Sequence, residues 1–159
     1  MGLDMYLKAD ILVSENIWDK TAKGAMINPS FSKILDAIEV SRDTLDGNWI
    51  TIQLNLGYWR KANAIHNWFV NECGGGIDEC QEIGVFQDKL VELKEICNKV
   101  LEVQHPDIAH DLLPTASGFF FGSTEYDEWY YKDLEHTIEI IDAAIAFPHT
   151  ENFIYQASW

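Results

Sequence analysis

The clearest structural signal in the sequence is residues 49–56, in which every second side chain is aliphatic. In an extended chain, one face carries Ile50, Ile52, Leu54 and Leu56, and the other carries Trp49, Thr51, Gln53 and Asn55. This period of two is typical of a β-strand with one buried face. We therefore predict a strand here, so the fold has to contain a sheet.

Two further segments alternate in the same way. Residues 2–8 place Leu3, Met5 and Leu7 at alternate positions. Residues 152–159 do the same with Phe153, Tyr155, Ala157 and Trp159. Both patterns predict strands, one near each end of the sequence.

Four other segments space their apolar residues three and four apart, as an amphipathic helix does. The first predicted helix, 30–46, is capped by Ser30 and ended by Asp46-Gly47, and the second, 58–70, has Tyr58, Ala62, Ile65 and Phe69 in one stripe. The third, 86–103, is expected to bury Phe86, Leu90, Leu93, Cys97, Val100 and Leu101. The fourth, 124–147, is capped by Thr124 together with Asp127 and closed by Pro148. The intervening residues 14–29 are predicted to be a loop, the region from Pro106 to Pro114 a connection, and 117–122 an aromatic turn or short strand.

Three strands and about four helices without regular βαβ alternation predict an α+β fold, with a small antiparallel sheet covered by the helices. The length of 159 residues fits a single domain, 1–159. The hydrophobic content of 47% is spread along the sequence, which favours a globular chain over a disordered one.

Acidic residues far outnumber basic ones. Twenty-six against eleven give a formal net charge of -15, so we expect no direct binding to a nucleic-acid backbone. Residues 100–159 hold eleven of the acids and one base, Lys132, which makes a local charge of -10 and leaves -5 for the first 99 residues.

The three cysteines, Cys73, Cys80 and Cys97, are odd in number and lack the spacing of a disulfide framework. Together with an N-terminus unlike a signal peptide, they predict a protein of the reducing cytoplasm. No apolar run approaches the roughly 18 residues that cross a bilayer, so we expect no membrane partner. The histidines and carboxylates show no ligand-motif spacing, and we expect neither a metal nor a cofactor.

The densest group of chemically active side chains lies in residues 58–68, where three predicted helical turns hold Tyr58, Trp59, Arg60, Lys61, Asn63 and His66. Cations at a helix start are disfavoured by a few tenths to about 1 kcal/mol, which suggests that Arg60 and Lys61 hold an anion or a carboxylate. In the alternative interpretation, Trp59 and Trp68 are core or rim residues, and both bases pair with the abundant acids.

A second candidate is the glycine-bracketed turn 118–127, which contains Ser123, Thr124, Tyr126 and Asp127. Hydroxyls and free backbone N–H groups at a helix N-terminus bind phosphate. The acids of this turn favour a competing interpretation, in which a carboxylate caps the helix and occupies the same donors.

We expect the two segments to fold against each other around a pocket for a small anionic, nucleotide-like ligand, stacked on Trp59 or Tyr126. This hypothesis makes the chain a binding protein. In a first alternative, the acidic segment 125–142 mimics nucleic acid and inhibits a host defence or nucleic-acid-binding protein. In a second, His66 acts with Asp127 or Glu125 in a small hydrolase or transferase. A solvated acidic face and a structural histidine are the simpler interpretations of these last two features.

Four segments resemble those of a family of small uncharacterised phage and prophage proteins: MGLDMYL at 1–7, YWRKANAIHNWF at 58–69, LPTASGFFFGSTEYD at 113–127 and ASW at 157–159. The resemblance implies a phage origin and hence the cytoplasm of the host cell. Small phage accessory proteins commonly bind a ligand or a host factor, but the resemblance implies no particular activity. Residues 8–48 and the cysteines lie outside it.

Overall fold

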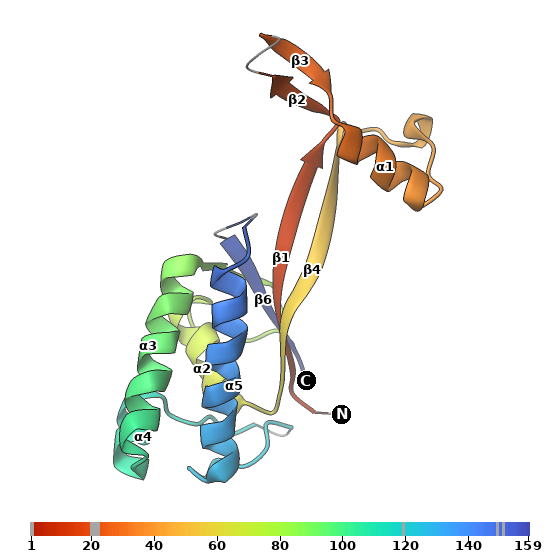
Figure 1. The fold of residues 1–159 in the computed structure, drawn as a ribbon. Helices are drawn as coiled ribbons and strands as arrows, with labels where there is room; N and C mark the ends of the chain where they lie inside the picture. The colour runs from red at the N-terminus through yellow and green to blue at the C-terminus, as the bar shows by residue number, and fades with distance from the viewer. Residues whose placement is uncertain (1, 20–22, 119, 149, 151) are drawn as a thin grey trace. The chain divides into compact units, whose positions relative to one another are not determined.

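A computed structural model describes residues 2–19, 23–118, 120–148, 150 and 152–159 of the chain. Over these residues the chain forms an α+β fold, drawn in Figure 1. Its elements in order are β1 (Asp4–Ser14), β2 (Asn16–Asp19), β3 (Gly24–Ile27), α1 (Pro29–Ala37), a 3-10 helix (Arg42–Thr44), β4 (Trp49–Arg60), α2 (Asn63–Glu72), β5 (Ile83–Phe86), α3 (Gln87–Val103), α4 (Pro106–Leu112), α5 (Glu128–Ile145) and β6 (Asn152–Ser158).

The chain divides into two compact units. Unit 1 consists of residues 1–9 and 54–159, and unit 2 of residues 10–53. Strands β1 and β4 each begin in one unit and end in the other, so their residues belong partly to each.

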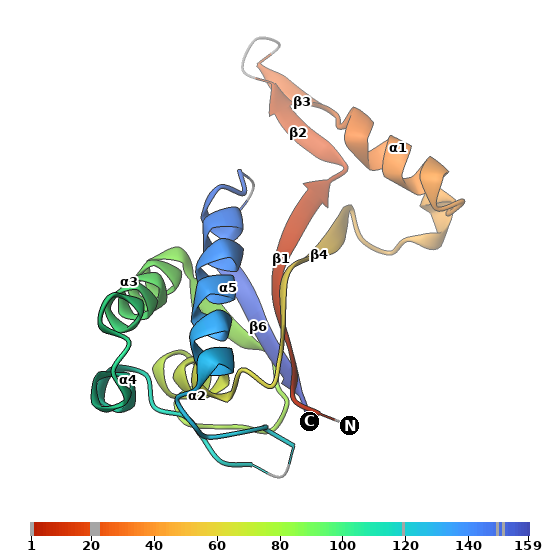
Figure 2. The same ribbon diagram turned by 60° about the horizontal axis from the view of Figure 1, so that its bottom comes forward.

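Unit 1 is built on an antiparallel sheet with the strand order β4-β1-β6-β5. Because Leu7 pairs with Tyr155 and Tyr155 with Ile83, these three side chains point to the same face of the sheet, and all three are buried. Helices α2, α3 and α5 lie together on one side of β1 and β6 in both Figures 1 and 2. The alternating apolar residues of the strands thus form a core together with the apolar faces of the helices. Buried helix residues include Phe69, Leu90, Leu93, Leu134 and Ile141.

The other face of this sheet carries polar side chains. Lys8 donates to Gln156 over 2.6 Å and forms an ion pair with Glu82 at 3.4 Å. Tyr58 lies on this face too, since its hydroxyl donates to Asp4 over 2.5 Å and its ring contacts Tyr6.

Helix α5 packs closely on β4 at Gly57. A Cβ atom built at this glycine would lie 2.2 Å from Ile140 Cγ2, a separation that no side chain tolerates. Two residues later, Trp59 is 2% exposed and its indole N–H donates to Thr137 of α5 over 2.9 Å. The glycine therefore allows the helix to approach the strand closely enough for this bond.

Unit 2 contains the β2–β3 hairpin, α1 and the 3-10 helix. Its central polar contact is a two-pronged pair in which Arg42 Nε and Nη2 donate to the two oxygens of Glu15 over 2.9 and 2.8 Å. These bonds lower the pKa of Glu15. Asn28 bonds to the carbonyl of Ser14 and caps α1, in which Pro29 occupies the first turn.

The α+β class and an antiparallel sheet are confirmed. The predicted strand 49–56 falls within β4, the predicted strands 2–8 and 152–159 overlap β1 and β6, and the predicted helix 86–103 matches α3. The numbers of elements differ, because the described part of the chain has five α-helices, a four-stranded sheet and a separate two-stranded one. The prediction of a single domain stays a prediction.

Several local predictions were wrong. Residues 58–60 continue β4, and α2 begins only at Asn63, because Trp59 alternates into the core as a strand residue. The predicted loop 14–29 contains the β2–β3 hairpin, and the connection from Pro106 contains α4. At the end of β5, Phe86 is 66% exposed instead of buried, and Trp159 is 45% exposed.

Two helix starts were also misplaced. The side chain that caps α1 is Asn28, two residues before the predicted Ser30, and α1 ends at Ala37. The side chain that caps α5 is Asp127, whose Oδ1 accepts from the N–H groups of Trp129 and Tyr130, and Thr124 lies outside the helix. Part of the predicted turn 117–122 falls on residue 119, which is outside the described residues.

None of the helices in the described ranges is long and apolar enough to cross a membrane.

We predict that Gly57→Ala destabilises unit 1 by about 1–3 kcal/mol, because the added methyl group has to displace Ile140 and with it α5. The measurement is the free energy of unfolding from urea denaturation. Gly84→Ala is the matched control, since a Cβ at this strand glycine meets no atom within 4 Å. Equal effects of the two substitutions would contradict the proposed close packing.

Candidate functional site

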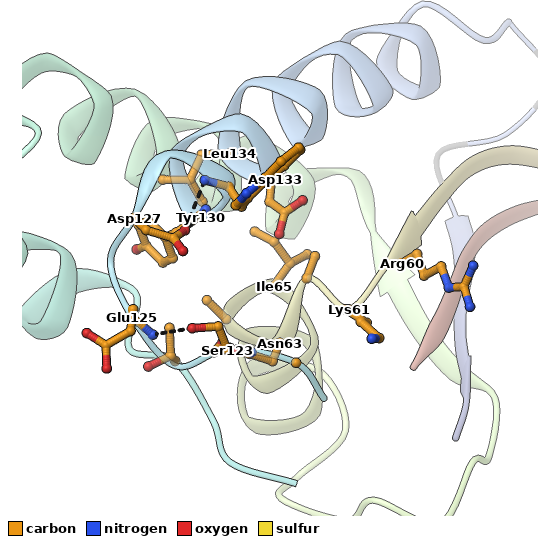
Figure 3. A pocket seen from close by; sticks show the side chains of 15 residues that line it. Arg60, Lys61, Asn63, Ile65, Ser123, Glu125, Asp127, Tyr130, Asp133 and Leu134 are labelled. Atoms are coloured by element: carbon orange, nitrogen blue, oxygen red, sulfur yellow. Dashed lines mark hydrogen bonds between the residues drawn. The ribbon is translucent and has the colours of Figure 1, made fainter. Parts of the chain in front are cut away.

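A cavity of about 320 Å³ lies in unit 1 between the β4–α2 junction, the loop that follows α4 and the first turns of α5 (Figure 3). Its volume is at the lower end of the range of small-molecule sites. The lining residues are Arg60, Lys61, Ala62, Asn63, Ala64, Ile65, Thr115, Gly122, Ser123, Glu125, Asp127, Trp129, Tyr130, Asp133 and Leu134.

The junction between β4 and α2 turns sharply at Lys61, whose φ of 62° lies in the left-handed region. The backbone N–H of Lys61 donates to the carbonyl of Leu3 over 2.8 Å, which ties the turn to the start of β1. Opposite it, Gly122 also has a positive φ of 90°, and a Cβ there would lie 3.2 Å from Lys61 Cβ. The glycine is thus the residue that lets the 113–127 loop pack against Lys61.

Asn63 holds this loop in place. Its amide nitrogen donates to the carbonyls of Phe121 and Ser123 over 3.1 and 2.7 Å, and its amide oxygen accepts from Ala116 N–H over 3.2 Å. The side chain is 4% exposed, so losing any of these bonds would leave a buried polar group without a partner. Asn63 therefore forms the wall of the cavity, and both of its donor hydrogens are already engaged.

The basic side of the cavity consists of Lys61 and Arg60. No described carboxylate lies within 4.0 Å of the Lys61 ammonium, whereas Arg60 has a loose ion pair with Asp4 at 3.9 Å. In Figure 3, Arg60 lies at the edge of the view beside the strands, and Lys61 lies nearer the other lining residues. Lys61 is therefore the cation that is better placed for a bound anion.

Ser123 adds a hydroxyl donor to the cavity. Its oxygen accepts from the N–H of Glu125 over 3.1 Å, which fixes the turn and leaves the hydroxyl hydrogen for another acceptor.

The acidic side consists of Glu125, Asp127 and Asp133. Asp127 is occupied as the cap of α5. Asp133 is half-buried, and none of the described residues donates a hydrogen bond to its carboxylate. Burial raises the pKa of Asp133 from its ordinary 3.8 to about 6, while nearby His136 lowers it and Asp127 raises it. A partly desolvated carboxyl group in a cavity is a typical functional candidate.

The aromatic wall includes Trp129, which is 70% exposed. The ammonium of Lys132 lies 4.8 Å from the centre of its ring and pairs with Glu128 at 2.5 Å. This contact orients the indole at the start of α5.

The structure places half of the predicted site residues at the cavity: Arg60, Lys61, Asn63, Ser123 and Asp127. It places the other half elsewhere: Tyr58, Trp59, His66, Thr124 and Tyr126. Tyr58 is on the open face of the sheet, and Trp59 is a core residue. Tyr126 bonds to His110 over 3.1 Å and packs edge-on against Tyr130, while the carbonyl of Thr124 accepts from the Thr115 hydroxyl.

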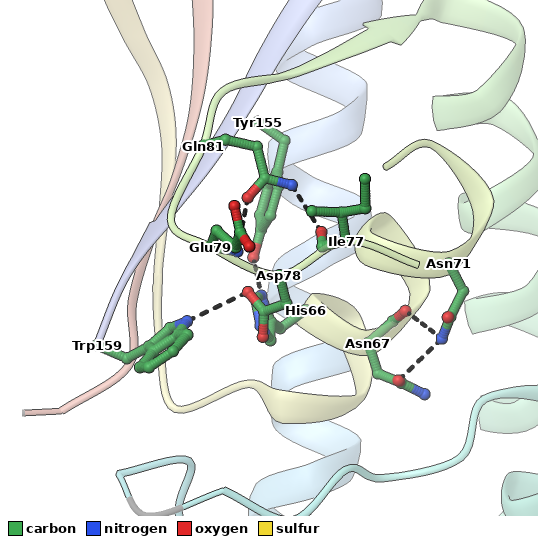
Figure 4. A network of polar contacts seen from close by, with 9 residues as sticks. All are labelled: His66, Asn67, Asn71, Ile77, Asp78, Glu79, Gln81, Tyr155 and Trp159. Carbon is green, nitrogen blue, oxygen red and sulfur yellow. Dashed lines mark hydrogen bonds and ion pairs between the residues drawn. The ribbon is translucent and has the colours of Figure 1, made fainter. Parts of the chain in front are cut away.

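His66 belongs to a separate polar network, shown in Figure 4. Its Nδ1 lies 2.7 Å from the Tyr155 hydroxyl and its Nε2 lies 3.0 Å from Asp78, which also accepts from the indole N–H of Trp159 over 3.2 Å. The ring is 2% exposed and is not part of the cavity lining. The predicted partners Asp127 and Glu125 are not its neighbours, so this geometry gives His66 no path to a ligand in the cavity.

The acids of segment 125–142 are partly compensated by bases. Glu128 pairs with Lys132, and Asp142 pairs with Lys94. These contacts lower the free negative charge that nucleic-acid mimicry would use.

Sequence reasoning missed Trp129, Asp133 and Glu125 as lining residues. Trp129 and Asp133 are four residues apart, so the predicted helix 124–147 already put both on one face, but no local pattern indicated that this face lies beside Lys61 and Ser123.

Two observations concern metal ligands and thiols in the described part of the chain. It contains no group of three or more His, Cys, Asp or Glu side chains arranged to hold a metal ion. Burial raises the pKa of Cys73 to about 11 and that of Cys97 to about 12, so both thiols stay protonated at neutral pH.

The raised pKa of Asp133 predicts a pH-dependent stability. Well below pH 3.8 the carboxyl is protonated in both the folded and the unfolded chain and has no effect on stability. As the pH rises to about 6, the unfolded chain loses this proton before the folded chain does, so the folded state becomes less stable by at most about 3 kcal/mol.

We therefore expect Asp133→Asn to raise the free energy of unfolding by about 1–3 kcal/mol at pH 7.5, with little gain at pH 4. Urea denaturation at a series of pH values measures this difference. Glu135→Gln removes an exposed carboxylate from the same helix and should show no such dependence. A gain that is equal at both pH values would contradict the assigned titration.

Comparisons of this chain with protein-family models, curated proteins and solved structures found no significant match. The chemistry of the cavity itself is therefore the basis for a functional proposal.

Proposed function

We propose that this chain is a phage-type accessory protein that binds a small anionic ligand of nucleotide-like character in the cavity of unit 1. The observation that carries the proposal is the convergence of Lys61 and the Ser123 hydroxyl with Trp129 and Asp133 around one cavity of about 320 Å³. These groups come from the β4–α2 junction, the 113–127 loop and α5.

The anionic group of the ligand binds to Lys61 and Ser123. The ammonium has no ion pair with a described residue, and the hydroxyl hydrogen is available, so both donate to a phosphate without losing an existing bond. Arg60 reaches the same group from the rim, where its 3.9 Å pair with Asp4 is loose enough to rearrange. The N-terminus of α5 does not take part, because Asp127 already caps it.

Because carboxylates also line the cavity, a simple anion such as inorganic phosphate is not the ligand that fits it best. Three acids against two bases leave the cavity slightly negative, so a bare phosphate would meet repulsion as well as attraction. A ligand that also carries N–H donors satisfies Asp133 and Glu125, as the amino group of a nucleobase does with carboxylates. An aromatic base would in addition stack on Trp129.

This assignment changes the predicted aromatic partner. Trp59 is buried and bonded to Thr137, and Tyr126 is bonded to His110, so neither ring is offered to the cavity. Trp129 takes the stacking role in the proposal, and Asp133 takes the role of base recognition.

Isothermal titration calorimetry with adenosine, guanosine, cytidine and uridine monophosphates tests the proposal. We expect at least one to bind, and we expect inorganic phosphate to bind more weakly because it lacks the base. Lys61→Met should weaken binding by roughly tenfold to a hundredfold, since a charge-assisted bond contributes about 1.5–3 kcal/mol. Trp129→Leu should weaken binding of the nucleotide but not that of phosphate.

Lys99→Met is the matched control, because Lys99 is an exposed lysine of α3 outside the cavity lining. It should bind as the wild type does. The absence of binding for all four nucleotides, or an equal loss in the Lys99 variant, would overturn the proposal.

A further inference from the structure

Asp133 is the lining acid of the cavity whose hydrogen-bonding capacity is unused. Of the other two lining carboxylates, Asp127 caps α5 and Glu125 is exposed to solvent. Asp133 is half-buried, and none of the described residues donates to its two carboxylate oxygens. In Figure 3 its side chain points from α5 toward Ile65, into the space between α5 and the start of α2. A ligand in the cavity therefore meets a carboxylate that has lost part of its water and has no protein donor in its place.

The carboxyl group of Asp133 is ionised at pH 7.5, although burial raises its pKa to about 6. An ionised carboxylate accepts hydrogen bonds through both oxygens and donates none. The group that complements it best is therefore rigid and carries two parallel N–H donors. The chain contains one such two-pronged pair elsewhere, between Arg42 and Glu15.

The nucleobases differ in the donors that they present along one edge. Guanine carries two adjacent donors, N1–H and the 2-amino group, which match the two oxygens of a carboxylate. Adenine and cytosine each carry an amino group beside a ring nitrogen that accepts, and this nitrogen would face the second carboxylate oxygen. Uracil has one N–H between two carbonyl groups, which also face the carboxylate unfavourably. Guanine is therefore the base that satisfies both oxygens of Asp133 at once.

The position of Trp129 suits the same base. It lies one helical turn before Asp133 on the same face of α5. Residues four apart on a helix have Cβ atoms roughly 5–6 Å apart, so one purine can stack on the indole and reach the carboxylate. Lys132 lies over one face of the indole, 4.8 Å from the ring centre, and a base stacks on the other face.

We propose that the Asp133 carboxylate selects a guanine nucleotide, by accepting from N1–H and the 2-amino group of a guanine that stacks on Trp129. This inference rests on the proposed function, since it names the base of the ligand whose phosphate binds to Lys61 and Ser123. A base with a single donor leaves one oxygen of the partly desolvated carboxylate without a partner. Guanosine monophosphate should therefore bind roughly tenfold to a hundredfold more tightly than the adenosine, cytidine and uridine monophosphates.

Isothermal titration calorimetry at pH 7.5 with guanosine, inosine and xanthosine monophosphates tests this contact on the full-length chain. The inosine nucleotide lacks the 2-amino group, the xanthosine nucleotide has a carbonyl in its place, and all three keep N1–H. The wild type should bind the inosine nucleotide roughly tenfold to a hundredfold more weakly than the guanosine nucleotide, because one bond to a charged oxygen is lost. The xanthosine nucleotide should bind more weakly still, since its 2-carbonyl faces the carboxylate.

Asp133→Asn should reverse the order of the guanosine and xanthosine nucleotides. The amide keeps one acceptor and gains one donor, so it matches N1–H and the 2-carbonyl of xanthine and opposes the 2-amino group of guanine. The variant should therefore bind xanthosine monophosphate more tightly than guanosine monophosphate. A general loss of structure would weaken both and could not reverse their order.

Glu135→Gln is the matched control, because it removes an exposed carboxylate of α5 outside the cavity lining. It should keep the wild-type order of the three nucleotides. Equal binding of guanosine and inosine monophosphates by the wild type, an unchanged order in the Asp133 variant, or a reversed order in the control would each overturn guanine selection alone. The absence of binding for every nucleotide would overturn the proposed function together with this inference.

Discussion

The side-chain amide of Asn63 is the contact on which the architecture of the candidate site depends. It joins the first residue of α2 to three backbone groups of the 113–127 loop, more than fifty positions later in the sequence, and it is buried. The described residues of this loop belong to no helix or strand, so its path past Lys61 and into α5 follows from these bonds and from Gly122. Without them, the basic and the acidic sides of the cavity would have no fixed separation.

Two buried polar side chains at the start of α2 point to different parts of unit 1. Asn63 and His66 begin the same helix, yet Asn63 faces the cavity and His66 faces Tyr155 and Asp78 on the other side. The imidazole is enclosed by aromatic rings, including Phe121 edge-on at 5.0 Å, and contributes to the packing of β6 on α2. The groups that remain available to a ligand are therefore those near the β4–α2 junction, chiefly the Lys61 ammonium. The segment 58–68, which is dense in reactive residue types, thus contains both side chains with a structural role and side chains that are accessible to a ligand.

Alternation and helical spacing predicted the main elements because burial of one face dominates their energetics. The prediction failed at residues 58–60, where Gly57 looks like a strand terminator but instead admits Ile140 of α5, so that β4 continues and Trp59 is buried. Strand β5 is only four residues long, and α4 has a single buried residue, so neither produces a recognisable period. Asp133 and Trp129 share a face of α5, and that this face lines the cavity follows from the packing of α5 beside the β4–α2 junction, which no local pattern in the sequence indicates.

The most direct test of the central claim, that the cavity of unit 1 is the ligand site, is amide chemical-shift mapping of the full-length chain by ¹H–¹⁵N NMR during titration with nucleoside monophosphates. We predict that the largest shifts fall on Lys61, Ser123 and Asp133 and on the indole N–H of Trp129, and that the indole N–H of Trp59 changes little. Shifts that instead cluster around His66 and Asp78, or that are absent at millimolar nucleotide, would contradict the claim.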